Sequence, residues 1–190
     1  MGDEEYKLMK QCGVLFMALM MLSGCALVTP ASEDYGKRSF GTYWDDQTAE
    51  SRGKKLIRDA HPELEDAHFT VTSFNGVALL TGQVPSEEAR QLAESTLAKL
   101  RHVKTVHNEL QIAGPTSMVA RTNDTWLSTK VKTALFTDEG IQSGRIKIVT
   151  EDGVVYLMGL LTRNEGEAAV ERARTVYGVQ KIVKVFEYIN

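Results

Sequence analysis

An internal repeat at a spacing of 77 residues constrains this chain more than any other feature. Residues 69–84 (FTVTSFNGVALLTGQV) align with residues 146–161 (IKIVTEDGVVYLMGLL), so that Gly76 falls on Gly153. Further along, residues 103–106 match residues 179–182 after a slip of one residue. A repeat this long that occurs twice indicates two related small domains rather than a solenoid.

Each copy carries the signal of a β-hairpin. Alternating β-branched residues lead to Asn75-Gly76 in the first copy and to Asp152-Gly153 in the second. Both residues of such a dipeptide require positive φ in a two-residue hairpin turn. The second strand of each hairpin is expected to close near Gly82 or Gly159, so these two glycines are included with the turn residues.

Helical segments flank the hairpin in both copies. Ser86 is expected to cap the helix that follows the first hairpin, and Thr162 with Glu165 predicts a capping box after the second. Thr48–His61 and Asp124–Phe136 have helical periodicity and precede the hairpins. Apolar alternation returns after each second helix and predicts a third strand.

The order α-β-β-α-β predicts an α+β fold with two tandem modules. Each module is expected to hold a three-stranded mixed sheet with two helices on one face. If the second and third strands are parallel, the helix between them makes a right-handed crossover. A module of about 70 residues is only marginally stable alone, so packing between the copies is expected to contribute.

The N-terminal segment has the pattern of a secretory signal peptide. Residues 14–22 are all apolar, and basic Lys7 and Lys10 precede them. This run is too short to span a bilayer. It ends in Ser23-Gly24-Cys25, which resembles the lipobox of bacterial lipoproteins, in which the cysteine receives a diacylglyceryl group. A plain secretory peptide and a chance cysteine after a buried helix are the alternatives.

These features predict the organisation of the whole chain. We expect a signal peptide at 1–24, a lipidated tether at 25–42, a first module at 43–112, a linker at 113–122 and a second module at 123–190. The chain has two cysteines, of which one lies in the leader and one is used for lipidation, so no disulfide is expected.

The repeat resembles the BON domain of bacterial envelope proteins. A lipobox followed by two such modules, together with residues 123–126 (NDTW) and 155–159 (VYLMG), is similar to the dual BON-domain lipoproteins of Gram-negative bacteria. The resemblance implies a lipid-anchored outer-membrane protein on the periplasmic face. It also implies binding to anionic phospholipid, support of envelope integrity and enrichment at division sites.

The helix that opens the second module is the expected site of lipid contact. On a helical wheel, its buried stripe consists of Leu127, Val131, Ala134 and Leu135. Two large aromatic residues miss this stripe, and two lysines accompany them. The expected phospholipid-binding residues are Trp126, Phe136, Lys130, Lys132 and Val131. As an alternative, Trp126 caps its own module and Phe136 packs under the loop that follows.

The first module differs at the corresponding positions. Thr48 stands where the second module has Trp126, and Ile57-Arg58 stands where it has Leu135-Phe136. The first module is therefore expected to lack the exposed aromatic pair and to serve in packing or partner binding.

Metal binding, catalysis and nucleic-acid binding find little support in the sequence. The histidines (His61, His68, His102 and His107) are confined to the first copy and do not repeat, so no metal site is expected. No cofactor and no enzymatic activity are expected. The net charge of −3 gives no basic field for nucleic acid. A monomer is expected, and the alternative function is a scaffold for an envelope or outer-membrane assembly partner.

Overall fold

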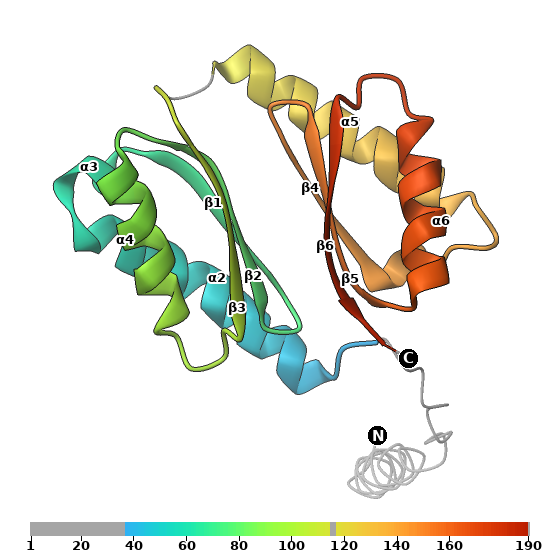
Figure 1. Cartoon of the computed structure of the whole chain (residues 1–190), viewed down its shortest axis with the longest axis horizontal. Helices are drawn as coiled ribbons and strands as arrows, with labels where there is room; N and C mark the ends of the chain where they lie inside the picture. Colours follow the sequence, from blue (N-terminus) through green and yellow to red (C-terminus); the bar gives the residue numbers. More distant parts are fainter. Residues whose placement is uncertain (1–36, 115–116, 190) are drawn as a thin grey trace, which may run out of the picture. The chain divides into compact units, whose positions relative to one another are not determined.

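Two copies of the α-β-β-α-β order follow one another along the chain (Figure 1). The computed structural model describes residues 37–114 and 117–189, so the expected signal peptide and Cys25 lie outside the described residues. The first copy consists of α2 (Phe40–Ala60), α3 (Pro62–Glu65), β1 (His68–Phe74), β2 (Val77–Val84), α4 (Glu87–Ala98) and β3 (Thr105–Ile112). The second consists of α5 (Met118–Phe136), the short 3-10 helix η1 (Ser143–Arg145), β4 (Ile146–Glu151), β5 (Val154–Leu161), α6 (Arg163–Arg174) and β6 (Lys181–Tyr188).

Each copy contains a three-stranded mixed sheet with the second strand in the centre. β1 pairs antiparallel with β2, and β2 pairs parallel with β3. The order β4-β5-β6 repeats this arrangement. The predicted mixed sheets are confirmed.

The hairpin turns have the predicted backbone conformation. Asn75 and Gly76 have φ values of 54° and 81°, and Asp152 and Gly153 have values of 49° and 73°. Two consecutive residues with positive φ give the turn the twist that an antiparallel pair needs. The predicted hairpins are therefore confirmed.

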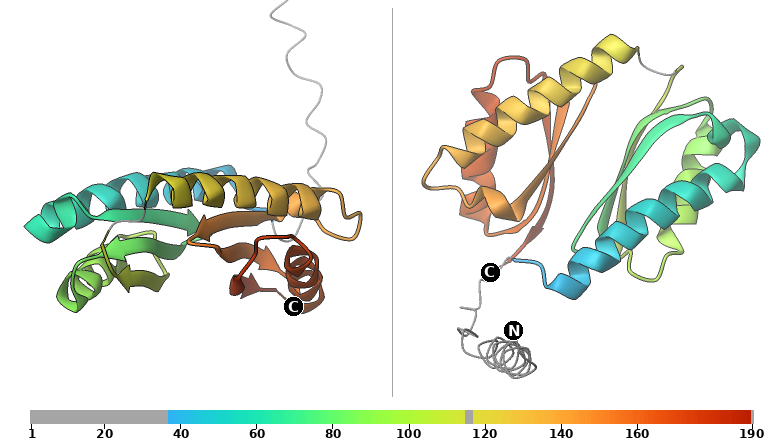
Figure 2. Two further views of the ribbon diagram at one scale, coloured as in Figure 1. Left: turned by 90° about the horizontal axis from the view of Figure 1, so that it is seen from above. Right: turned by 180° about the vertical axis from the view of Figure 1, so that it is seen from behind.

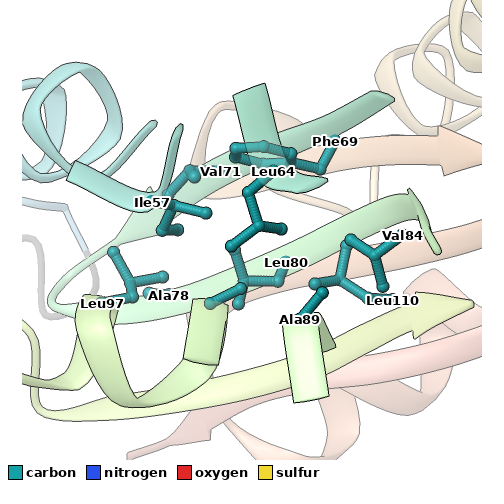
Figure 3. Close-up of a cluster of buried hydrophobic side chains, with 11 residues drawn as sticks. Ile57, Leu64, Phe69, Val71, Ala78, Leu80, Val84, Ala89, Leu97 and Leu110 are labelled. Atoms are coloured by element: carbon teal, nitrogen blue, oxygen red, sulfur yellow. The ribbon is translucent and has the colours of Figure 1, made fainter. Parts of the chain in front are cut away.

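The two longer helices of each copy cover one face of its sheet, as predicted (Figure 1). The short α3, which the sequence analysis did not predict, adds the buried Leu64 to the core of the first copy. In the first copy, α2 contributes Ile57 and α4 contributes Leu97 to a core that includes Leu80 of the central strand (Figure 3). In the second copy, Val131 of α5 and Ala169 of α6 pack with other buried residues in the same way. α2 and α5 are the long helices, and each lies along the sheet of its own copy (Figure 2).

The faces of the sheets that carry no helix contribute to a third apolar cluster. It contains Phe74 and Leu79 from the first copy and Tyr156, Met158 and Val185 from the second. Burial between the copies raises the pKa of the Tyr156 phenol to about 12, with Glu109 and Glu151 adding to the effect. The central strands are thus buried on both faces, which explains why β5 reads as a nearly continuous apolar run.

Polar side chains also join the two copies. Gln83 donates a hydrogen bond of 2.9 Å to Glu151, and Asn75 donates one of 2.7 Å to Glu187. Lys147 pairs with Glu50. The predicted contribution of packing between the copies is supported by these contacts and by the third cluster.

The first helix of each copy, α2 or α5, is called the opening helix here, and both begin earlier than the periodicity predicts. α2 starts at Phe40 rather than Thr48, and α5 starts at Met118, inside the segment expected to be a linker. The reason lies in their caps, because Ser39 accepts from Thr42 N and Ser117 accepts from Ala120 N. Among the described residues, no helix combines the length and apolar character needed to cross a membrane.

The later helices begin as predicted. The Ser86 hydroxyl accepts from Ala89 N, and Thr162 and Glu165 form the capping box. Burial alone raises the pKa of Glu165, but the hydrogen bonds from Thr162 and the nearby Arg145 guanidinium lower it overall.

The two glycines expected to close the second strands lie inside them. β2 continues beyond Gly82 to Val84, and β5 continues beyond Gly159 to Leu161. A Cβ on Gly82 would lie 2.2 Å from the carbonyl oxygen of His68. Gly82 therefore permits close approach of β1 rather than a turn.

Candidate functional site

Helix α5 packs one stripe of side chains into the core of the second copy. Leu127, Val131 and Leu135 are buried there, as the helical wheel predicts. Ala134 on the same stripe is partly buried. This anchoring fixes which residues of α5 face the solvent.

The two large aromatic side chains of α5 point away from the core. The exposed fraction is 62% for Trp126 and 77% for Phe136. Their separation of ten residues corresponds to about 15 Å along the helix axis. The alternative in which both rings pack on their own module does not occur in this structure.

Val131 does not belong to the lipid-contacting surface that the sequence predicts. Its side chain is fully buried in the core of the second copy. It lies between Leu127 and Leu135 on the packed stripe, so it cannot reach a membrane without unfolding the helix from its sheet. Its assignment as a binding residue is therefore corrected to a core position.

The exposed face of α5 carries positive charge without nearby carboxylates of its own. Lys130 Nζ lies 5.6 Å from the centre of the Trp126 ring, and Lys132 is exposed. Asp124 is the single acidic residue of the helix and is buried. The surface of α5 is therefore suited to an anionic partner.

Around the helix axis, threonines line the exposed face between the directions of the two lysines. Their hydroxyls are already hydrogen-bonded. Thr125, Thr129 and Thr133 each donate to the carbonyl oxygen four residues earlier, at 2.9–3.0 Å. A hydroxyl with an internal acceptor loses less when water is removed from around it. This face can therefore approach an apolar or interfacial phase at low cost.

A surface depression of about 350 Å³ lies beside Trp126. Its walls include Lys130 and Asp152, and Tyr177 in the turn after α6 forms part of its rim. Tyr177 is 91% exposed, and Lys130 Nζ lies 5.9 Å from its ring centre. Lys130 thus stands between two exposed aromatic rings.

Asp124 has a structural role. Its carboxylate accepts hydrogen bonds from the backbone N–H groups of Asp152 and Gly153 at 2.8 and 2.9 Å. Asp46 makes the equivalent bonds to the hairpin turn of the first copy, from Asn75 and Gly76 at 2.8 and 3.0 Å. Each opening helix is therefore fastened to the turn of its own sheet.

Among the described residues, sequence reasoning missed five exposed aromatic side chains, one of which is Tyr188 at the end of β6. Tyr177 lies in a turn, and Phe40, Tyr43 and Trp44 lie on the first two turns of α2, partly in the segment expected to be a tether. The expectation that the first module lacks exposed aromatics holds at the positions equivalent to Trp126 and Phe136 but is wrong for the module as a whole. An aromatic-rich segment outside the helical periodicity was the available signal.

Within residues 37–114 and 117–189, no three histidine, cysteine, aspartate or glutamate side chains gather into a possible metal site. His102 instead pairs with Asp45 at 3.3 Å.

The family model for the BON domain matches residues 45–114 and 123–190, and the chain belongs to this family. It is 31% identical over 191 residues to the outer membrane lipoprotein DolP of Haemophilus influenzae, covering 96% of this chain and 97% of that protein. The chain is accordingly a dual BON-domain lipoprotein that is anchored by lipid in the outer membrane.

Two further relatives share most of the chain. A 21 kDa hemolysin of Actinobacillus pleuropneumoniae is 34% identical over 154 residues, covering 80% of this chain and 79% of the relative. The osmotically inducible protein Y of Escherichia coli is 25% identical over 152 residues, covering 78% and 75%.

Proposed function

We propose that this protein binds the anionic phospholipid surface of the membrane through α5, on its periplasmic side, without catalysing a reaction. The observation that supports the proposal best is the pair of exposed rings, Trp126 and Phe136, on a helix whose own carboxylate is buried. Aromatic rings settle at the level of the lipid headgroups, and lysine ammonium groups attract the phosphates. Lys130 and Lys132 supply that charge.

The free-energy contributions of these side chains indicate that α5 binds the membrane weakly. Burying one large apolar side chain is worth about 1.5–3 kcal/mol, and each lysine near an anionic surface adds about 1 kcal/mol. Loss of translational and rotational freedom on association costs at least about 4 kcal/mol. Two rings and two lysines therefore give a modest net affinity for the membrane. An affinity of this size suits reversible binding that depends on lipid composition better than permanent attachment.

The lipid anchor expected at Cys25 would compensate for this weakness. Residues 26–39 separate it from α2, so even a fully extended chain keeps the start of α2 within about 50 Å of the anchor. A protein held at such a range meets the surface at high effective concentration. By its resemblance to the family, we also propose that the protein supports envelope integrity and is enriched at division sites.

Substitution of the exposed rings tests the proposal. We expect Trp126→Glu and Phe136→Glu each to weaken binding to phosphatidylglycerol micelles about tenfold or more, because each removes an inserting ring and adds a repelling charge. Residue-by-residue NMR titration measures the loss, and circular dichroism checks that the fold is kept. Ile112→Glu is the matched control, because Ile112 is 54% exposed and lies at the end of β3.

Unchanged line broadening of the two α5 variants with these micelles would contradict lipid binding by this helix. In that case the scaffold alternative gains support if crosslinks from the first module reach a single envelope protein.

A further inference from the structure

The start of α2 carries an exposed cluster of rings, here called the aromatic patch and consisting of Phe40, Tyr43 and Trp44. Their exposed fractions are 77%, 43% and 57%. Trp44 contacts both neighbours edge to face, with ring centres 6.0 Å from Phe40 and 6.3 Å from Tyr43. A contiguous group of large rings on the surface marks an interaction site more often than scattered single residues do.

The packing of α2 explains why the patch is exposed. The buried residues of the helix begin at Asp46, which is fastened to the hairpin turn of the first copy. The residues before it extend past this attachment point. Arg38 fixes this end of the helix, since its guanidinium lies 4.0 Å from the Phe74 ring centre, lies 5.5 Å from that of Tyr43 and bonds Asp46 at 2.8 Å.

The charges around the aromatic patch are balanced. Lys37 and Arg38 precede it, and Asp45 and Asp46 follow it directly. Arg38 is paired with Asp46, and Asp45 lies 3.3 Å from His102. This surface therefore differs from α5, which presents lysines without an exposed carboxylate of its own. Apolar and aromatic area, rather than charge, dominates what the patch can recognise.

We propose that the aromatic patch is a second membrane contact, which inserts into the interface of the leaflet that holds the lipid anchor. Phe40 follows the expected anchor, Cys25, by fifteen residues, so even a fully extended chain places it within about 50 Å of the anchor. Tryptophan and tyrosine favour the headgroup level, and phenylalanine favours the boundary with the acyl chains. The inference rests on lipid anchoring at Cys25 and not on the lipid binding proposed for α5.

The aromatic patch and the exposed face of α5 border the same depression. Tyr43 of α2 and Lys132 of α5 line the same surface depression, of about 390 Å³. The two contacts differ in their dependence on conditions. The α5 contact requires anionic lipid and weakens with salt, whereas the aromatic patch requires neither anionic lipid nor low salt.

The chain contains two tryptophans, Trp44 and Trp126, so each contact has its own fluorescent reporter. The full lipidated protein is reconstituted into vesicles of phosphatidylethanolamine and phosphatidylcholine with brominated acyl chains, at high salt. In the Trp126→Phe variant, we expect the emission of Trp44 to shift to the blue and to fall about twofold relative to vesicles without bromine, as for a ring at the interface.

Two substitutions in the same background locate the effect. Phe40→Glu is expected to abolish the quenching of Trp44. Leu56→Glu is expected to leave it unchanged, because Leu56 is 44% exposed on the same helix but lies outside the aromatic patch. Circular dichroism verifies that both variants keep the fold.

An unquenched, solvent-exposed Trp44 in the lipidated protein overturns the proposal, as does quenching that survives Phe40→Glu in a folded variant. The Trp44→Phe variant reports separately on Trp126 in vesicles that contain phosphatidylglycerol. Failure of the α5 contact is thereby distinguished from failure of the aromatic patch.

Discussion

Asp46 and its counterpart Asp124 connect a helix to a turn that is distant in sequence. Asp46 accepts from the hydroxyl of Ser73 at 2.7 Å as well as from the turn and from Arg38. Burial alone raises the pKa of Asp46, but the hydrogen bonds from the Gly76 backbone, Arg38, Ser73 and the Asn75 backbone together lower it. The carboxylate form is therefore the one that stabilises the fold.

This shift predicts a pH-dependent cost of Asp46→Asn. Because the folded pKa lies below the unfolded value, the stabilisation is fully present above the unfolded pKa and is lost as the pH falls through the folded pKa. We expect Asp46→Asn to cost about 2 kcal/mol at pH 7 and progressively less below about pH 4. Urea denaturation at several pH values measures the difference.

Asp45→Asn is the matched control for this prediction, because Asp45 is adjacent and about half exposed. Its substitution is expected to change the free energy of unfolding by less than about 0.5 kcal/mol. An Asp46→Asn cost that stays constant down to acidic pH would contradict the assigned role of the carboxylate.

At the scale of elements, close approach of β1 and β2 depends on Gly82. Its φ is +117°, and a Cβ there would lie 2.7 Å from the Cα of Phe69 in addition to its clash with His68. Gly159, its repeat partner, lacks positive φ, and its added Cβ would lie 2.9 Å from the Arg145 carbonyl oxygen. The two copies thus solve the same packing problem with different strain.

We expect Gly82→Ala to cost about 3 kcal/mol or more, because both the backbone conformation and the space oppose a side chain. Gly159→Ala is expected to cost less. Gly114→Ala serves as the control, since nothing lies within 4 Å of an added Cβ there. Thermal unfolding followed by circular dichroism ranks the three variants, and equal stability of Gly82→Ala and Gly114→Ala would refute the steric argument.

The helices show how much local pattern can predict. The periodicity of residues 124–136 correctly assigned Leu127 and Leu135 to the core and left Trp126 and Phe136 outside. The same reasoning missed residues 118–123 and 40–47 as helix, because those turns have little or no apolar stripe and depend on the caps Ser117 and Ser39. A capping hydroxyl before a polar segment is a weak signal without the structure.

At the scale of the whole molecule, two helix-covered cores are joined by a third cluster in which both sheets take part. Leu79 and Met158 are fully buried in it. Burial raises the pKa of Glu151 beside the cluster, although the hydrogen bond from Gln83 and the charge of His68 oppose the effect. Nearby Asp124 and Asp152 add to the rise. Deprotonation of Glu151 as the pH rises from the unfolded to the folded pKa therefore lowers stability.

This arrangement predicts that the copies can be uncoupled. We expect the parent protein to unfold in one calorimetric transition. Met158→Asp introduces an unpaired charge into the third cluster but leaves the first core untouched, so we expect this variant to unfold in two transitions. The lower transition should correspond to the second copy. Ile112→Asp, at an exposed position, should keep one transition. A single unchanged transition for Met158→Asp would show that the cluster does not couple the copies.

The sequence by itself determined the features that depend on neighbours along the chain. These are the two hairpin turns, the capping box of α6, the α-β-β-α-β order and the buried stripe of α5. Each follows from backbone conformation or from periodicity within a few turns, so no distant contact is needed to define it.

Only the tertiary structure decided what becomes exposed and what lies between the copies. A strand that is apolar on both faces, such as β5, does not reveal which residues face helices and which face the other sheet. The exposure of Phe40, Trp44 and Tyr177 depends on where the sheet and its turns end in space. Burial is a property of non-local neighbours, so these rings and the membrane contact proposed for the aromatic patch became visible only in the folded chain.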